Sequence, residues 1–429
     1  MKRQHSARHY LSALLGTGVY LLSGAVWAAT IFVNAANNSG IEDGTLTNPY
    51  DTVGEALGAV AAGETVSVAP GVYYGGMSLP NVPVSVVSQE GPEVTILDGM
   101  GNTYAIVNAA NPPHVVNVTF DGFTIANAFY GVFAWSPWRT YNPPVVTLRN
   151  SILQNLGTGV RASILSTVTV ENTTIVDTDN ALEVIWGRSA IFHNVTIDNA
   201  ARAIWSYQYP SAQMFNTTIS NVDTAFSLNN YVQLTGSHNN VWNYEVLEKP
   251  NHTIPGTLNI TDTISVDPLF IAAPDDYRLD RESPLIDAGI DVGLPYEGAA
   301  PDIGAYEFND LTLPERVDQL ATSFAEAPPD IYREPGEQRR HALYLKLMAV
   351  VNMISAPDHA NSPNDKVQNL NGALHKLQND ILQKIDGNNG GKPANDSIDD
   401  PVEKGQFYNR VVDLIDFVQA EIDAINVAN

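Results

Sequence analysis

The chain has 429 residues, 44% of them hydrophobic, with a formal net charge of -25 and no cysteine. The hydrophobic fraction is sufficient for a packed core and excludes a wholly disordered chain. The acidic excess argues against a nucleic-acid partner, and the lack of cysteine excludes disulfides, zinc–thiolate sites and cysteine nucleophiles.

The first 28 residues have the features of an export signal. A basic start with Lys2, Arg3 and Arg8 precedes an apolar stretch, and Ala28 ends a run of small residues suited to cleavage. The alternative is a retained membrane anchor, but several glycines and serines make the stretch too polar to span a bilayer comfortably. We expect cleavage after Ala28 and a mature protein without a membrane span, secreted, periplasmic or on the cell surface.

A repeat of 22 residues occupies the middle of the chain. Asparagines recur at this interval, each followed at fixed distances by an aliphatic residue, a polar turn residue and a small–apolar pair; they are Asn150, Asn172, Asn194 and Asn216. The segments between them are short, alternating and rich in Val, Ile and Thr, which indicates three short strands per unit. Such strands cannot bury an apolar face alone, so the units must stack. The pattern predicts an all-β solenoid, a right-handed parallel β-helix with asparagine ladders along its corners.

Both ends of the repeat carry motifs of a known superfamily. The N-terminal motifs are a DG…NPY segment, GETV and APGVYY, and the C-terminal motifs are DPLF, DYRL, SPLIDAG and PDIGAYE. Together they resemble the entry and closure of secreted bacterial β-helix proteins of the pectate-lyase-like superfamily, so the resemblance implies a β-helix over residues 29–308. Helical spacing in residues 49–62 predicts a helix that caps the first coil. Because the superfamily includes lyases, hydrolases, epimerases and adhesins, the resemblance selects no activity.

Acidic residues are frequent in the C-terminal closure. They are Asp267, Asp275, Asp276, Asp280, Asp287 and Asp302. Their spacing does not form a calcium-binding shell, so we expect them to cap turns. Ca²⁺ is a candidate cofactor, but the sequence assigns it no ligands and predicts no metal-binding residue.

The alternation of the repeat predicts which side chains point outward from one sheet. One row contains Phe133, Arg161, Glu183, Trp205 and Ser227, and the next contains Trp135, Ser163, Ile185, Tyr207 and Asn229. Asp179 and Arg202 precede the same strands, and Trp138 and Arg188 flank them. Aromatic rings beside an arginine and a carboxylate are typical of a sugar-binding surface. The alternative interpretation is a plain ion pair between Arg161 and Glu183 with aromatics that cover the scaffold.

Two chemistries compete if this face is catalytic. A polysaccharide lyase needs a base beside a uronate carboxylate. No lysine occurs between Lys2 and Lys249. The candidate bases are therefore Arg161, Arg202 and Arg188. A glycoside hydrolase needs two carboxylates, for which Glu183 with Asp179 is the plausible pair. The candidate catalytic residues are thus Arg161, Glu183, Asp179 and Arg202, and the candidate substrate-binding residues are Phe133, Trp135, Trp138, Arg188, Trp205 and Tyr207.

The C-terminal part has a different composition. Residues 309–335 are rich in Pro, Glu and Asp and indicate a linker, whereas residues 336–429 contain three amphipathic segments that predict a three-helix bundle. The phrase LHKLQNDILQKIDGNNGGKPAND resembles a helical module of secreted bacterial surface proteins, the FIMAH-like type. That resemblance implies an appendage for attachment to a cell surface.

Taken together, these features predict an exported protein that binds polysaccharide and, if the face is catalytic, cleaves it as a lyase or glycoside hydrolase. The alternative function is that of a non-catalytic surface or adhesion protein that binds glycan or protein.

Overall fold

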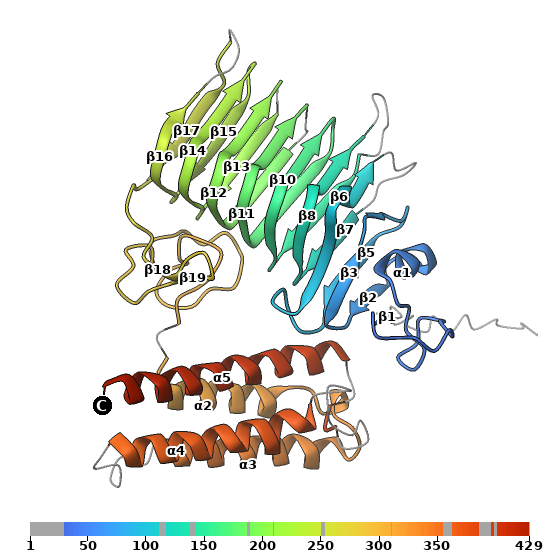
Figure 1. Ribbon diagram of the computed structural model, residues 1–429, viewed down its shortest axis with the longest axis vertical. Coiled ribbons are helices and arrows are strands. Elements are labelled where there is room, and N and C mark those ends of the chain that lie inside the picture. The colour runs from blue at the N-terminus through green and yellow to red at the C-terminus, as the bar shows by residue number, and fades with distance from the viewer. Residues whose placement is uncertain are drawn as a thin grey trace, which may run out of the picture.

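The computed structural model describes residues 30–110, 117–136, 143–186, 189–208, 210–249, 254–309, 311–354, 363–385, 396–398 and 401–428. The expected export signal lies outside this part of the chain. A solenoid of stacked strands forms the N-terminal part, and a group of long helices forms the C-terminal part (Figure 1). Within the described residues, no helix is both long enough and apolar enough to cross a membrane.

The solenoid consists of strands that pair in parallel with the corresponding strands of the neighbouring coils. The strands are β1 (Thr30–Val33), β2 (Thr65–Val68), β3 (Gly71–Tyr74), β4 (Met77–Ser78), β5 (Val84–Ser88), β6 (Thr95–Ala110), β7 (Asn117–Asp121), β8 (Thr124–Trp135), β9 (Val145–Arg149), β10 (Ile152–Ser163), β11 (Thr167–Ile185), β12 (Ser189–Tyr207), β13 (Ser211–Phe215), β14 (Thr218–Asn229), β15 (Gln233–Ser237), β16 (Asn240–Glu248) and β17 (Thr257–Thr261). Residues 22 apart are partners in the repeat, as in Leu153 with Ile175 and Ile175 with Ile197. The predicted parallel solenoid with 22-residue coils is confirmed.

The strands of the coils form three sheets, each of which extends along the solenoid. The first sheet contains β5, β7, β9, the starts of β11 and β12, then β13, β15 and β17. The second and third sheets come from the two halves of the long strands, among them β8, β10, β11, β12 and β14. Alternate side chains of each sheet point inward and form one apolar core along the whole stack.

The corner asparagines explain why the coils stack so regularly. Asn172, Asn194 and Asn216 adopt positive φ angles of 44°, 52° and 50°, a conformation that asparagine tolerates better than most residues. Each donates its side-chain N–H to the side-chain oxygen of the asparagine one coil earlier, at 3.2, 3.1 and 3.0 Å respectively. The repeat asparagine is therefore required both by the backbone turn and by the hydrogen-bond ladder.

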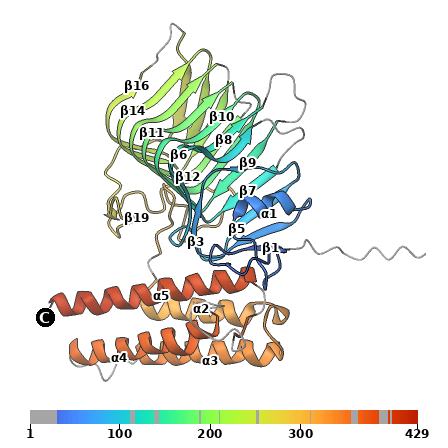
Figure 2. The same cartoon turned by 45° about the vertical axis from the view of Figure 1, so that its right-hand side comes forward.

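Helix α1 (Val53–Ala59) lies at the N-terminal end of the solenoid (Figure 2). Thr52 is its N-cap, with a side-chain oxygen that accepts a hydrogen bond from the Glu55 N–H at 3.3 Å. Val53, Ala56 and Leu57 are buried and belong to the solenoid core. The helix thus covers apolar side chains of the first coils that would otherwise meet water.

The C-terminal closure motifs lie along the side of the solenoid, on the outer surface of the second sheet. The Tyr277 hydroxyl donates to the Asp198 carboxylate at 3.0 Å, the Ala305 N–H to the Thr196 hydroxyl at 2.9 Å, and the Ile290 N–H to the Asn216 side chain at 2.8 Å. This segment contains the antiparallel pair β18 (Phe270–Ala272) and β19 (Asp276–Leu279). Several of its aspartates accept backbone N–H bonds in turns, as in Leu269 N–H to Asp267 at 3.0 Å.

The C-terminal part has one long helix more than the sequence indicates. Its elements are α2 (Leu313–Glu326), the 3₁₀ turn η1 (Pro329–Ile331), α3 (Gly336–Ile354), α4 (Pro363–Lys376), the π-helical turn η2 (Leu377–Ile381), the 3₁₀ turn η3 (Leu382–Lys384) and α5 (Pro401–Ala428). Helix α2 lies within the predicted linker, so that prediction was wrong. Pro314 is in the first turn of α2, where proline is compatible with a helix, and Thr312 with Glu315 forms a capping box.

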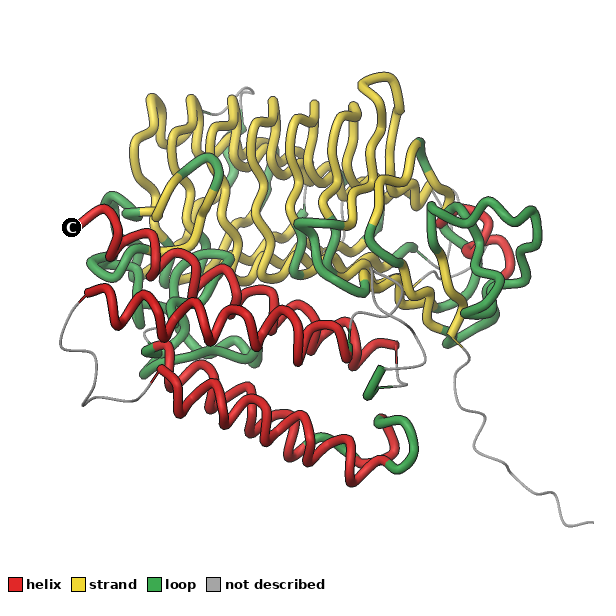
Figure 3. The backbone as a smooth tube through the Cα atoms, turned by 60° about the horizontal axis from the view of Figure 1, so that its bottom comes forward, coloured by secondary structure: helices red, strands yellow, loops and turns green. Residues whose placement is uncertain are grey.

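The buried face of α2 completes the core of the helical part. Val317, Leu320 and Phe324 pack in one cluster with apolar residues of α3, α4 and α5. The described part of the bundle therefore has four long helices, α2 to α5 (Figure 1), and Figure 3 shows long helices of this part running alongside one another. This cluster shares no residue with the solenoid core.

Candidate functional site

The predicted outward row is present on the third sheet. Phe133 is aligned with Arg161, Arg161 with Glu183, Glu183 with Trp205, and Trp205 with Ser227. The register follows from the 22-residue spacing, except that 28 residues separate Phe133 from Arg161. Hydrogen-bonded strands lie about 4.8 Å apart, so these side chains stand on neighbouring coils and can touch.

A second row faces the first across a bend in each strand. It contains Tyr130, Thr158, Asn180 and Arg202, which are aligned by the same ladders. Between the two rows lie two consecutive inward residues, such as Gly131 and Val132, where a Cβ on Gly131 would lie 2.7 Å from the Gly159 carbonyl oxygen. The missing side chain permits the close approach of the next coil at this position. We call the two rows together the bend face.

The centre of the bend face is an ion pair between Arg161 and Glu183. Arg161 Nη1 lies 3.1 Å from Glu183 Oε1 and 3.2 Å from Oε2, and it also donates to the Tyr130 hydroxyl at 2.6 Å. The Glu183 residue is only 2% exposed although it points away from the core. Arg161 Nε is buried and has no hydrogen-bond partner among the described residues.

Burial dominates the electrostatics of this pair. It raises the pKa of the Glu183 carboxyl above its ordinary value, and the opposing attraction of Arg161 and Arg202 only reduces the shift. Burial also raises the pKa of the Tyr130 phenol, against the attraction of Arg161. Glu183 is thus a carboxyl group that holds its proton more readily than one in water, beside two guanidinium groups.

Aromatic rings lie on both sides of the ion pair along the stack. On one side, Tyr130 and Phe133 stack at 5.0 Å, and the exposed rings of Tyr104 and Phe129 pack against Tyr130 at 5.2 and 4.6 Å. On the other side, the Arg202 guanidinium lies 5.7 Å from the centre of the Trp205 ring. Tyr104 is 59% exposed and Phe129 is 55% exposed, so two apolar ring faces remain accessible to a ligand.

The other predicted site residues have varied positions. Trp135, Ser163, Ile185 and Tyr207 are aligned on neighbouring coils, as predicted. Trp135 and Tyr207 are half-buried. Ile185 is only 9% exposed, so it does not offer an outward side chain. Asp179 is exposed, and the charges that shift the pKa of Glu183 are those of Arg161 and Arg202. The predicted positions Trp138 and Arg188 lie outside the described residues.

Sequence reasoning did not identify three aromatic residues of the bend face: Tyr104, Phe129 and Tyr130. Tyr130 could have been found, because it occupies the same register position as Thr158, Asn180 and Arg202. Tyr104 could not, because its strand shifts register between Asp98 and Thr103 and so departs from the repeat.

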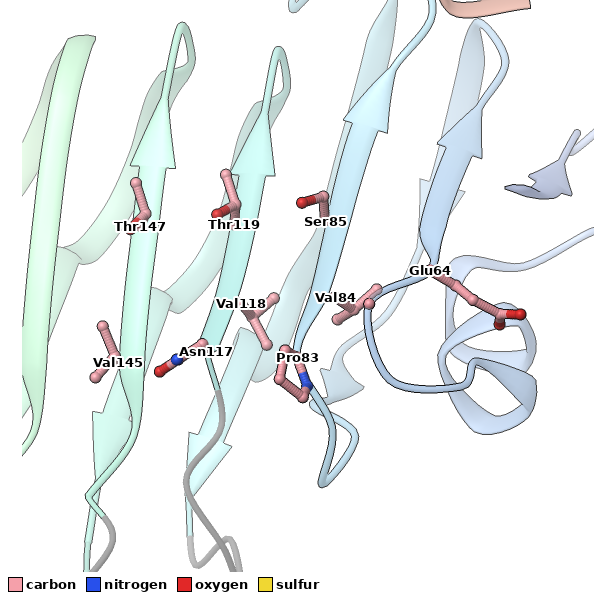
Figure 4. A pocket seen from close by; sticks show the side chains of 10 residues that line it. Glu64, Pro83, Val84, Ser85, Asn117, Val118, Thr119, Val145 and Thr147 are labelled. Atoms are coloured by element: carbon pink, nitrogen blue, oxygen red, sulfur yellow. The ribbon is translucent and has the colours of Figure 1, made fainter. Parts of the chain in front are cut away.

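A separate hollow of about 250 Å³ lies on the first sheet. Figure 4 shows Ser85, Thr119 and Thr147 side by side on adjacent strands there, with Asn117 and Val145 in the next row. The Glu64 carboxylate at its edge accepts a hydrogen bond from the Ala61 N–H at 2.7 Å. Its hydroxyl and amide groups can form hydrogen bonds, but among the residues that line it there is no arginine–carboxylate pair.

One group of carboxylates has a geometry that could hold a cation. Oxygen atoms of Glu42, Asp51 and Glu55 lie within 4.8 Å of one another near α1. A hydrogen bond with Glu55 is the main reason that the pKa of Asp51 is raised. These residues are at least partly exposed, and nothing else at this position indicates a ligand.

One family model supports the fold. The family model described as a right handed beta helix region matches residues 106–250, about a third of the chain. A search of the curated proteins finds no match. Pectate lyase Pel9A is similar at 12% identity and a TM-score of 0.37, over 66% of this chain and 98% of that chain. A rhamnogalacturonan lyase is similar at 10% identity and a TM-score of 0.36, over 50% and 74%.

Proposed function

We propose that the protein is exported and binds polysaccharide at the bend face. The observation that carries this proposal is the pair of partly buried Arg161 and buried Glu183, with aromatic rings on both sides of it along the stack. Tyr104, Phe129 and Trp205 offer ring faces for stacking on sugar rings, and Arg161 and Arg202 offer N–H donors to sugar oxygens. Together these groups can bind a chain of several sugar units that lies along the stack of coils.

The geometry favours binding over a lyase reaction that uses Arg161 as base. A base must be uncharged before it can take a proton from the substrate. The Glu183 carboxylate, within 3.2 Å of the Arg161 guanidinium, favours the charged guanidinium instead. A hydrolase reaction is the second candidate, and one observation supports it: the raised pKa of Glu183 suits a general acid. Asp179, the predicted partner of Glu183, is exposed, and the charges that affect the pKa of Glu183 are those of Arg161 and Arg202.

The test measures binding and cleavage together. The purified protein is mixed with uronate-containing and neutral polysaccharides, with and without Ca²⁺, while affinity electrophoresis, unsaturated products and reducing ends are followed. We expect retention that Trp205→Ala and Arg161→Ala each reduce by roughly tenfold or more. The matched control is Tyr296→Ala, which removes an exposed ring of the C-terminal segment and should leave retention unchanged.

The outcomes separate the alternatives. Reducing ends that Glu183→Gln abolishes would establish a hydrolase, and unsaturated products lost in Arg161→Ala would establish a lyase. Absence of retention on every polysaccharide would contradict the proposal and favour a surface protein that binds another protein.

A further inference from the structure

The helical part contains a cationic pocket that is unrelated to the bend face. It has a volume of about 340 Å³ and is lined by residues of α3, η3 and the segment 396–398, among them Gln338, Arg339, Lys346, Lys384 and Ser397. Three of these side chains carry a positive charge. This is unexpected in a chain with a formal net charge of -25, and six of the chain's eight lysines lie between residues 346 and 404.

Secondary structure directs the three cations to one place. Arg339 and Lys346 are seven residues apart on α3, that is about two turns, so they lie on the same face of the helix. The chain then leaves α4 through a π-helical turn and a 3₁₀ turn, which brings Lys384 to the pocket. Lys346 Nζ donates to the Asp380 carbonyl in the π-helical turn at 2.7 Å, which links the two walls. Such turns are frequent at functional sites.

The carboxylates near the pocket that the structure describes are paired with other lysines. Asp396 is paired with Lys404 at 3.0 Å, and Asp380 with Lys376 at 3.4 Å. Arg339 Nη1 donates to a backbone carbonyl, that of Asp396, at 3.3 Å. Among the described residues, no carboxylate forms an ion pair with Arg339, Lys346 or Lys384, and the Nε atom of Arg339 is buried without a partner.

Repulsion between the lysines also favours an anion in the pocket. The pKa of Lys346 is lowered by burial and by the charges of Lys384 and Lys376, with only Asp380 opposing the shift. An anion between these side chains would remove that repulsion and satisfy the free guanidinium N–H. The pocket is therefore built for a negatively charged ligand.

We infer that this pocket binds a tetrahedral oxyanion ester, the phosphate or sulfate group of a modified sugar, where the choice of a sugar as carrier rests on the proposed function. Three cations suit a group with three terminal oxygens better than a carboxylate, which has only two. A volume of about 340 Å³ is larger than a bare ion requires and lies in the range of small-molecule sites. The sugar ring would occupy the remaining space beside Gln338 and Ser397.

Calorimetric titration of the full-length protein tests this inference. The probes are glucose 6-phosphate, glucose 6-sulfate, glucuronate and glucose at low salt. We expect saturable binding of one or both esters, weaker binding of glucuronate and none of glucose. Binding should weaken as salt is added, because the attraction is electrostatic. The two ester probes distinguish a phosphate ligand from a sulfate ligand.

Variants connect the binding to the pocket. Lys384→Gln should weaken ester binding by roughly tenfold or more, since it removes a charged donor. Lys366→Gln is the matched control, because Lys366 lies in the same bundle but pairs with Glu421 at 2.8 Å. If Lys384→Gln does not fold, Gln338→Glu places a repelling carboxylate at an exposed lining position and should abolish binding.

Three results would overturn the inference: no saturable binding of either ester, glucuronate binding as tight as ester binding, or an equal loss in Lys366→Gln. Trp205→Ala should leave ester binding unchanged, so failure here and failure of the bend face as a polysaccharide site can be told apart.

Discussion

Arg161 and Arg149 both pair with a carboxylate on an adjacent coil, but their surroundings differ. The Arg149 side chain is 46% exposed and lies 2.8 Å from Asp121, whereas the partner of Arg161 has a side chain only 3% exposed. Water screens the first pair, so its contribution to stability is small. The second pair lies in a less polar environment, where loss of one partner leaves a buried charge.

Replacement of Arg161 should therefore cost more stability than replacement of Arg149. Arg161→Ala should lower the free energy of unfolding by about 3 kcal/mol, because Glu183 loses its main counter-charge. Arg149→Ala should lower it by about 0.5 kcal/mol. Urea denaturation followed by circular dichroism measures both, and equal losses would contradict the contrast in burial.

The asparagine ladder should contribute to the stability of the solenoid. Asn194→Ala removes two side-chain hydrogen bonds and places alanine at a φ of 52°, so we expect a loss of about 2–4 kcal/mol. Asn194→Gly should lose about 1 kcal/mol less, because glycine adopts positive φ freely. Denaturant unfolding of both variants tests the argument, and alanine as stable as glycine would show that the turn conformation is unimportant.

The C-terminal segment along the second sheet carries a pH-sensitive carboxyl. Burial, followed by repulsion from Asp302, raises the pKa of Glu307 from 4.5 to about 7. Its folded-state pKa lies above the unfolded value, so the folded protein binds more protons, and stability falls as pH rises from about 4.5 to 7.

Glu307→Gln should remove that part of the pH dependence. We expect the variant to gain roughly 2 kcal/mol relative to the wild type between these pH limits, after allowance for partial exposure. Thermal unfolding of both proteins across this pH range measures the difference, and parallel curves would show that Glu307 does not titrate there. Glu315→Gln is a suitable control, since Glu315 lies outside this segment and its pKa is lowered instead.

Sequence periodicity predicted the repeating strands and most of the helices, but not the position of the closure or helix α2. The 22-residue spacing predicted the partners of Arg161 and Glu183, because the same backbone turn recurs in every coil. It could not reveal the position of the closure, which depends on contacts such as Tyr277 with Asp198 across 79 residues. Helix α2 was missed because the Pro, Glu and Asp content of residues 309–335 indicated a linker, although proline is allowed in a first helical turn, where Pro314 lies.

The two large apolar cores of the described residues are separate, and a third, small cluster of Leu279, Leu285 and Ile303 lies in the C-terminal closure. The cluster of the solenoid runs along its coils, and that of the bundle joins α2, α3, α4 and α5. In a chain with one continuous core, loss of packing anywhere would destabilise the whole protein. With two cores, each part can unfold at its own temperature, so the chain need not behave as a two-state system.

Differential scanning calorimetry should therefore resolve two transitions. Leu347→Ala creates a cavity in the bundle and should lower only the bundle transition, by the several degrees expected for a loss of about 2–5 kcal/mol. Leu182→Ala does the same within the solenoid core and should shift only the other transition. If either variant moves both transitions together, the solenoid and the bundle unfold as one cooperative unit, and the pocket between α3 and η3 would then depend on the solenoid for its shape.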